Sequence, residues 1–451
     1  MTESSKGTSR RAQWGLVAFL TCISMLAQID KNILVLMVGP IQRDFGVGEV
    51  EISFLIGTAF AVANVLCGLP AGWLADRADR RTVVALAVAL WSIAVASNAA
   101  ASTFLALVVA RVVVGAAEAL VPPSAYSLIR DGVDESRRAR ALSVYTMALM
   151  LGTGLSLVLG GPLIGMVSAS GIHALPLFGH VFSWQIVLLL VGIAGVPLSG
   201  LIFLSADPGR RAGACEQAAA APARVGRYLA DNRRVLMPLL VFAVAHSMIT
   251  YGLGSWMPTM TARRFGLGLS SIGLLQGGLL LTMGPLGLWA AGWAMGREGG
   301  QRPATAIEVG TFVTLALTVL VVAMCSTRSL VTFWIVDAMV VLFSWTFMAV
   351  TSTLVAVIVP ASIVGSVMAV VLVLVGLIGQ GSAPSVIALV SRYGFGPGVD
   401  SLPDAMAVVF LASGVVALIA ARVLRRRLRD LVHDISADDA QVARERPLHS
   451  N

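Results

Sequence analysis

Two long apolar stretches of this 451-residue chain contain charged residues: Asp30 and Lys31 in one, Arg111 and Glu118 in another. A charge at mid-membrane costs at least ~2.5 kcal/mol unless it is paired or hydrated, so these side chains are expected to face a cavity or each other. Asp30 and Glu118 can carry protons, whereas Lys31 and Arg111 can bind an anion. The four predict proton coupling and anion binding, and the alternative is a static salt-bridge network that fixes packing.

The second part of the chain has fewer candidates. Asp337 is a possible second proton site, with a packing role as the equal alternative. Tyr251, Trp256 and Gln380 are polar or aromatic residues of apolar stretches and are predicted to contact substrate. Each of them can instead be a packing residue or an interfacial anchor, because aromatic side chains serve both purposes in membranes.

The composition excludes a soluble protein, since 57% of the residues are apolar and 12% are charged, against roughly a quarter in soluble domains. The net charge of +8 comes from scattered arginines rather than from a basic face, so nucleic acid is not an expected partner. The five histidines show no zinc spacing, and no phosphate-binding Gly-rich loop occurs, so we predict no catalytic site, metal or cofactor beyond a coupling proton. A membrane enzyme or a transport-inactive sensor is the alternative from another class.

Twelve apolar runs, each long enough to cross a bilayer, predict an all-α polytopic membrane protein. A polar break divides them, giving an N-tail (1–13), a six-helix half (14–205), a linker (206–234), a second half (235–424) and a C-tail (425–451). The runs are 14–39, 52–75, 82–101, 103–129, 140–168, 183–205, 235–260, 271–295, 303–325, 329–358, 363–391 and 402–424.

Basic residues are retained in the cytoplasm, and they are unevenly distributed here. Of the 32 Lys and Arg residues, 25 fall on the side of the two termini and five on the opposite side. This distribution predicts a multi-pass protein of a bacterial inner membrane with both termini in the cytoplasm.

The two halves align without gaps at an offset of 220 residues, with twelve identities in the 35 positions that start at Arg43 and Arg263. Because an even number of spans separates the copies, both have the same orientation. The halves should therefore be related by a pseudo-two-fold axis along the membrane normal, with a binding site between them.

The segment from Gly72 to Arg81 resembles the signature loop of the major facilitator superfamily, Gly-x-x-x-Asp-Arg-x-Gly-Arg-Arg, with Asp79 where that family often has Gly. The second copy keeps Arg297. The resemblance implies a latch at the cytoplasmic side, in which Gly72 allows close helix approach and the charged groups bridge helix ends. The latch residues would be Gly72, Asp76, Arg77, Arg81 and Arg297, with Arg80 carrying less weight. The alternative is that the arginines only set topology.

Asp30-Lys31-Asn32 and the Arg111 to Glu118 element resemble the spinster-like and anion:cation symporter branches of this superfamily. The resemblance implies a secondary transporter that moves a small organic anion or an amphiphile by alternating access, and we expect a monomer in the lipid bilayer. A lysolipid or drug exporter of the same fold is the alternative. The sequence leaves open the substrate, the direction, and the choice between symport and antiport.

Overall fold

The computed structural model describes residues 10–170, 174–175, 179–205, 221–296, 303–360 and 363–445. The side chains of Leu69, Asp76, Leu175, residues 221–224 and residues 431–445 lie outside that description. Twelve helical segments within these ranges are long and apolar enough to cross a membrane, which confirms the predicted all-α polytopic fold. They extend over Arg10–Leu36, Glu49–Gly68, Arg80–Ala100, Phe104–Gly132, Glu135–Ala169, Ser183–Leu204, Arg233–Phe265, Leu269–Gly296, Pro303–Ser326, Leu330–Ile358, Val364–Phe395 and Ser401–Asp430.

The helices and strands form two groups, which we call the N-half and the C-half. The N-half contains α1 (Arg10–Leu36), α2 (Val38–Phe45), α3 (Glu49–Ser53), the π-helical turn η1 (Phe54–Thr58), α4 (Ala59–Arg77), α5 (Arg80–Ser97), η2 (Asn98–Ala100), α6 (Phe104–Glu118), α7 (Val121–Gly132), α8 (Glu135–Ala169), β1 (Ala174–Leu175), β2 (Gly179–His180), α9 (Ser183–Leu201) and η3 (Ile202–Leu204). The C-half contains α11 (Ala221–Asp231), α12 (Arg233–Phe265), α13 (Leu269–Gly296), α14 (Pro303–Ser326), α15 (Leu330–Ser344), α16 (Thr346–Ile358), α17 (Val364–Leu374), the π-helical turn η4 (Val375–Gln380), α18 (Gly381–Val390), η5 (Ser391–Phe395) and α19 (Ser401–Glu445).

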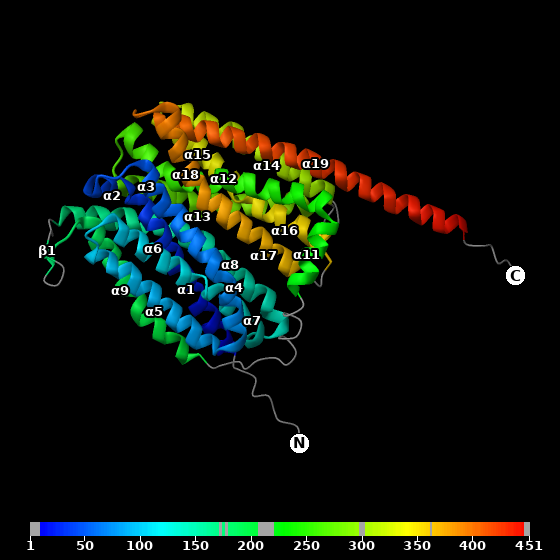
Figure 1. The fold of residues 1–451 in the computed structure, drawn as a ribbon, viewed down its shortest axis with the longest axis horizontal. Helices are drawn as coiled ribbons and strands as arrows, with labels where there is room; N and C mark the ends of the chain where they lie inside the picture. Colours follow the sequence, from blue (N-terminus) through cyan, green and yellow to red (C-terminus); the bar gives the residue numbers. More distant parts are fainter. Residues whose placement is uncertain are drawn as a thin grey trace, which may run out of the picture.

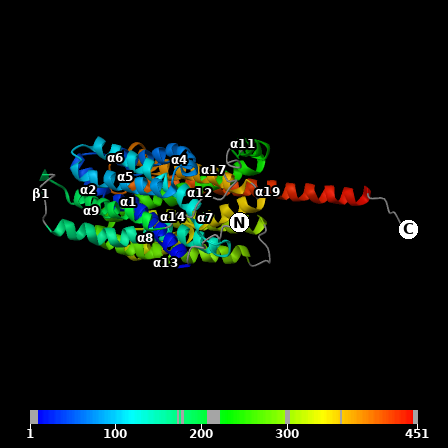
Figure 2. The ribbon, with the colours of Figure 1, turned by 90° about the horizontal axis from the view of Figure 1, so that it is seen from below.

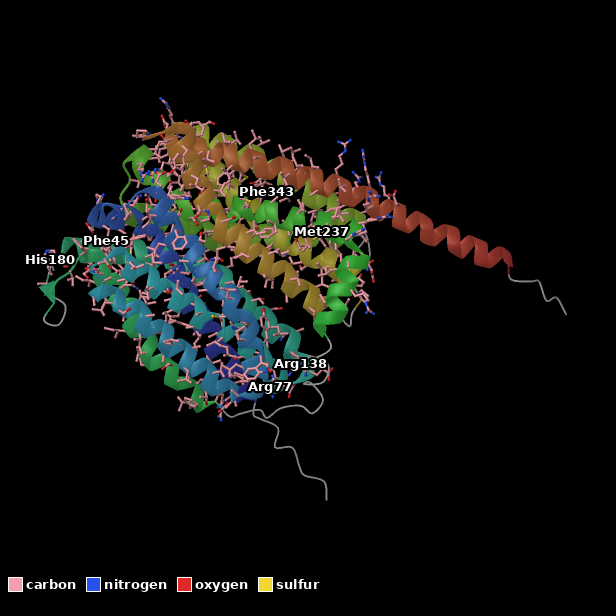
Figure 3. All side chains as sticks on the ribbon, in the orientation of Figure 1. Phe45, Arg77, Arg138, His180, Met237 and Phe343 are labelled. Atoms are coloured by element: carbon pink, nitrogen blue, oxygen red, sulfur yellow. The ribbon has the colours of Figure 1, made fainter. Side chains whose placement is uncertain are left out.

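The two halves lie side by side with their helices roughly along the same direction (Figure 1). We call the end at which α1 begins the tail end, and the end with the turns at 46–48 and 266–268 the loop end. Arg77 and Arg138 mark the tail end, whereas Phe45 and His180 mark the loop end (Figure 3). The short β1–β2 hairpin, paired antiparallel between Ala174 and His180, projects from the loop end.

Part of the predicted linker is helical. α11 occupies Ala221–Asp231 and is amphipathic, so that Val225 is buried while Tyr228 and Leu229 pack against the C-half. The Tyr228 hydroxyl donates to the Ile358 carbonyl at 3.1 Å and ties α11 to the end of α16. At the same end of the C-half, α19 continues beyond the predicted last span and extends away from the bundle (Figure 1).

Small residues bring α8 of the N-half and α13 of the C-half together, and both views show these helices adjacent (Figure 2). A Cβ added to Gly273 would lie 2.4 Å from the Leu157 carbonyl oxygen. One added to Gly277 would lie 2.6 Å from the Gly154 carbonyl oxygen. Close backbone approach through small residues is how helices associate in lipid, where no hydrophobic effect drives them together.

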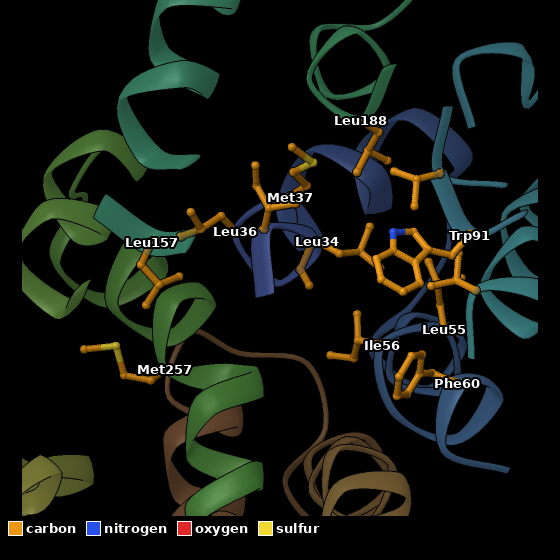
Figure 4. Close-up of a cluster of buried hydrophobic side chains, with 14 of the residues drawn as sticks. Leu34, Leu36, Met37, Leu55, Ile56, Phe60, Trp91, Leu157, Leu188 and Met257 are labelled. Carbon is orange, nitrogen blue, oxygen red and sulfur yellow. The ribbon is translucent and has the colours of Figure 1, made fainter. Parts of the chain in front are cut away.

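The apolar core of the N-half holds the segment that follows Asp30 and Lys31. Leu34 lies beside Trp91 and Leu55 in a buried cluster that also contains Phe60 (Figure 4). Trp91 is 1% exposed, and Leu34 is 5% exposed. This packing fixes the rotation of α1, and therefore the direction in which its charged residues point.

We predict that Gly273→Ala weakens the contact between the halves, because its new Cβ has no room against the Leu157 carbonyl. The expected result is a lower thermal unfolding midpoint in mild detergent. Gly278→Ala is the matched control on the same helix, because a Cβ there meets nothing within 4 Å, and it should leave the midpoint unchanged. Equal midpoints for the two variants would contradict this account of the interface.

Candidate functional site

The four charged residues that the sequence singles out come together inside the N-half. Arg111 Nη1 lies 3.5 Å from Asp30 Oδ2, and both side chains are about 5% exposed or less. Arg111 Nη2 also lies 3.5 Å from the Lys31 carbonyl oxygen. Charge interactions link Lys31 with Glu118, whose side chain is 9% exposed. α1 and α6 therefore place two acids and two bases in one buried cluster, as the spacing predicts.

Phe60 on α4 contacts both cations of this cluster, and the sequence did not predict its role. Its ring lies 4.5 Å from Lys31 Nζ and 4.8 Å from Arg111 Cζ, measured to the ring centroid. The aromatic face attracts both cations and keeps them close despite their like charge. No sequence signal marks Phe60, because an apolar residue in an apolar helix is the ordinary case.

A cavity of about 260 Å³ lies between the halves. Lys31 is the one basic residue among the described residues that line this cavity. The predicted substrate residues Tyr251 and Gln380 also line it. The Tyr251 ring contacts Trp345 edge-on at 6.1 Å. The other lining residues are Gln28, Asn32, Val35, Ile56, Leu149, Thr153, Leu157, Thr250, Leu253, Gly254, Ser255, Met257, Pro258, Gln276, Leu280, Val341, Ser344, Met348 and Leu372.

Asp30 and Arg111 lie outside this wall and line a separate, smaller cavity of about 20 Å³ together with Asn98. That volume is enough for one water molecule, and a water needs two to four polar partners to be stable in such a place. Asp30 Oδ2 and Arg111 Nε are buried without a hydrogen-bond partner among the described residues. Asp30 and Arg111 are thus separated from the central cavity, and the predicted contact of Arg111 with substrate is not seen in this conformation.

Two further predicted site residues, in the C-half, also lie away from the cavity wall. Trp256 is fully buried, and its Nε1 donates to the Pro384 carbonyl at 3.0 Å, so the expected substrate contact is replaced by a role in packing α12 against α18. Asp337 is also fully buried, behind Gln276, a residue that lines the cavity. Neither carboxylate oxygen of Asp337 has a hydrogen-bond partner among the described residues.

At the loop end, polar contacts join the two halves. Arg263 of the C-half pairs with Glu49 of the N-half and donates to Gln42 at 3.0 Å. Arg392 lies 3.5 Å from Glu51. Below these pairs, the Thr58 hydroxyl of η1 donates to the Gly381 carbonyl at 2.8 Å. Ser53 also contacts Ser385, so the loop end is closed by both ion pairs and short hydrogen bonds.

The tail-end loop is arranged differently from the predicted latch. A Cβ at Gly72 would meet nothing within 4 Å, so no described helix approaches this glycine closely in this conformation, and its role in the latch stays a prediction. Arg77 stacks on Trp73, with Cζ 4.5 Å from the ring centroid. Arg81 donates to the Ser205 carbonyl at 3.1 Å, within the N-half. Arg297 and the side chain of Asp76 lie outside the described residues.

Arg80 is the buried arginine of this loop. It is 3% exposed, pairs with Asp131 at the end of α7, and donates to the Ser127 hydroxyl at 2.9 Å. The sequence analysis gave Arg80 less weight than its neighbours. Repeated arginines look alike in a sequence, and only the fold shows which one turns inward.

Asp79, which departs from the signature pattern, begins α5 as its N-cap. Its carboxylate accepts from the Arg81 backbone N–H at 3.0 Å and from the Thr82 hydroxyl at 3.2 Å. Desolvation acts to raise the pKa of Asp79, but these hydrogen bonds and the Arg81 charge outweigh it and hold that pKa below its ordinary value. The cap therefore contributes stability above the pKa of an unfolded aspartate and loses it as the pH falls.

In a comparison against known families, residues 20–384 match the profile of the Major Facilitator Superfamily. This match agrees with the twelve spans, the two halves and the signature loop. The chain belongs to this superfamily. It is therefore a membrane transporter rather than an enzyme, and it binds small-molecule substrates within the membrane.

The relatives of this superfamily member fall into several groups. An "MFS-type efflux pump" of Mycolicibacterium smegmatis is 25% identical over 68% of each chain. A "probable galactarate/D-glucarate transporter" of Bacillus subtilis is 27% identical, but the match covers 44% of this chain and 41% of the relative. The Drosophila melanogaster protein spinster is 24% identical over 44% of this chain and 31% of its own length. The latter two matches thus span less than half of the relatives.

Solved structures show the same fold over nearly the whole chain. A bacterial homologue of the human lysosomal transporter spinster, in an inward-facing and unoccupied conformation, superposes with a TM-score of 0.81 at 21% identity, covering 95% of this chain and 99% of that chain. The occupied inward-facing form of that homologue gives a TM-score of 0.77.

We predict that Arg80→Gln lowers the thermal unfolding midpoint far more than Arg77→Gln does. Breaking a fully buried ion pair costs about 3–5 kcal/mol. Arg80→Gln should cost part of that, because Asp131 keeps its pair with the exposed Arg130, whereas Arg77 lies on the exposed Trp73 ring. Adding Asp131→Asn to Arg80→Gln should restore part of the loss. Equal midpoints for the two single variants in mild detergent would show that Arg80 is only a topology signal.

Proposed function

We propose that this transporter moves a small organic anion together with protons by alternating access of the cavity between its halves. The observation that carries the proposal is Lys31, a cation in the cavity wall that contacts Phe60 and borders the buried acids Asp30 and Glu118. A carboxylate in the cavity would pair with the Lys31 ammonium, while hydroxyl and amide groups of the C-half, from Tyr251 and Gln380, would contact its polar body.

Proton coupling would follow from the charge balance of the cluster. Asp30 and Glu118 share the two cations Lys31 and Arg111, so protonating either acid leaves a cation in excess. A cation in excess attracts an anion, and an anion in the cavity in turn favours the protonated acid. This reciprocal dependence is what links substrate and proton in one binding event. Asp337, behind Gln276, is the proposed second proton site in the C-half.

We further propose that the tail end is cytoplasmic, because 25 of the 32 basic residues fall on that side and positive charge is retained there. The closed loop end would then face outward, as in an inward-facing state. The fold's similarity to an inward-facing homologue supports this orientation. The bacterial relatives support an inner-membrane location.

Sugar-acid transporters among the relatives support an anionic cargo: besides the Bacillus subtilis protein, a "D-galactonate transporter" of Escherichia coli is 26% identical over 46% of this chain. A second candidate is export of an amphiphile. The apolar residues of the cavity wall, such as Leu149, Met348 and Leu372, favour this candidate because they suit the apolar part of an amphiphile. The efflux pump among the relatives agrees with this alternative.

We predict that Lys31→Gln abolishes uptake of D-galactonate or galactarate into proteoliposomes without loss of folded protein, because the cavity loses its cation. Folding is checked by size-exclusion elution and the thermal midpoint. Glu308→Gln is the control, because Glu308 lies at the surface of the C-half, where it pairs with Arg425, and is not part of the charged cluster of the N-half. Normal uptake by Lys31→Gln would refute the anion site. Stabilisation of the wild type by lysolipids, with none by the acids, would favour the amphiphile exporter.

We predict that Asp30→Asn and Glu118→Gln, tested separately, reduce the acceleration of uptake by an inward proton gradient, because each removes an acid that can change its charge beside Arg111 or Lys31. The measurement is the ratio of initial rates with and without the gradient. An unchanged ratio in both variants would remove these acids from the coupling mechanism.

A further inference from the structure

A groove of about 570 Å³ opens at the loop end, between α2 and the turn that follows α12. It is distinct from the central cavity, and its lining residues are Leu36, Gly39, Pro40, Gln42 and Arg43 on one side and Thr259, Ala262, Arg263, Gly266, Leu267, Gly268 and Leu269 on the other. Its two charged lining residues are Arg43 and Arg263, and no acidic residue is among those that line it.

The two sides of the groove are copies of each other, but their polar partners are not. Gly46 and Gly266 end α2 and α12 with φ angles of 64° and 65°, so both turns have the same backbone conformation. Arg43 and Arg263 hold equivalent places at the repeat offset of 220. Arg263 has two acceptors, Glu49 and Gln42.

The positions equivalent to these acceptors on the other side are Leu269 for Glu49 and Ala262 for Gln42, and both line the groove. Arg43 is exposed at this groove, and the positions that would supply its carboxylate and amide acceptors are occupied by apolar residues. The nearby carboxylate of Asp44 is already held by Trp184 Nε1 at 2.8 Å. Within the described part of the chain, Arg43 forms no ion pair or side-chain hydrogen bond.

We propose that this groove is a second anion site, in which an organic carboxylate binds Arg43 with Arg263 as the neighbouring cation. A guanidinium offers a planar fork of donors to a carboxylate, and the apolar floor from Leu36, Pro40 and Leu269 suits the carbon skeleton of an organic acid better than a bare halide. The choice of carboxylate rests on the proposed function. The site would collect the anion at the closed end of the transporter.

The test uses Gly39→Cys, which puts a thiol in the groove at a position where a Cβ meets nothing within 4 Å. Purified protein in detergent is treated with a negatively charged methanethiosulfonate, and modification at position 39 is followed by peptide mass spectrometry. Galactarate or citrate is added with chloride adjusted to hold the ionic strength constant. We expect saturable slowing of the modification by both acids.

Adding Arg43→Gln should raise the acid concentration needed for half-protection by about tenfold, as expected for loss of one charge-assisted contact. Arg328→Gln is the matched control, because it removes another loop-end arginine that is paired with Asp400 outside the groove. It should leave the protection unchanged. No protection in Gly39→Cys, or full protection that survives Arg43→Gln, would overturn the proposal.

The same assay in a Lys31→Gln background separates this site from the central cavity. Protection that persists there places the anion in the groove, whereas its loss would mean that the signal comes from the cavity and would overturn the second site. If protection holds but galactarate is not transported, the cargo proposal fails and the groove site stands. If galactarate is transported but does not protect position 39, the groove site fails and the cargo proposal stands.

Discussion

The structure depends on holding four charged side chains inside one half of a membrane bundle. An unpaired charge in that environment is expensive, so Asp30, Lys31, Arg111 and Glu118 must remain near each other in any folded state. Phe60 makes this arrangement feasible by placing one aromatic ring against both cations. The close packing of α1 around Leu34 then fixes which of the charges reaches the cavity, and only Lys31 of the four lines it.

The repeat shows that the two halves contribute different chemical groups to the cavity. At the offset of 220 residues, Asp30 and Lys31 correspond to Thr250 and Tyr251, and both of these neutral residues line the same cavity as Lys31. The two copies therefore differ in chemistry at these positions: the N-half has an acid and a cation where the C-half has two hydroxyl groups.

The sequence predicted the spans, the repeat and the charged cluster because each has a signal that does not depend on tertiary detail. Ionisable residues in apolar helices are rare, and seven-residue spacing places Arg111 and Glu118 on one face. The sequence could not show which face of α12 is turned inward, since that helix is apolar nearly all round, and Trp256 was therefore assigned to the cavity when it packs against Pro384. Phe60 was missed because an apolar residue in an apolar helix has no distinguishing signal, and Arg80 was underweighted because neighbouring arginines of one loop look alike in a sequence.

The contacts within a half and the polar contacts between halves differ in strength, and this difference is what permits a conformational change. Arg80 and Asp131 are buried in the same half, so this pair is not broken when the halves move. The loop-end pair of Arg263 and Glu49 is partly exposed, and exposed ion pairs contribute about 0–1 kcal/mol each. Closure by several weak contacts leaves the two access states close in free energy. A ligand with a modest preference for one state can then shift the population, whereas a single buried inter-half pair would lock the transporter.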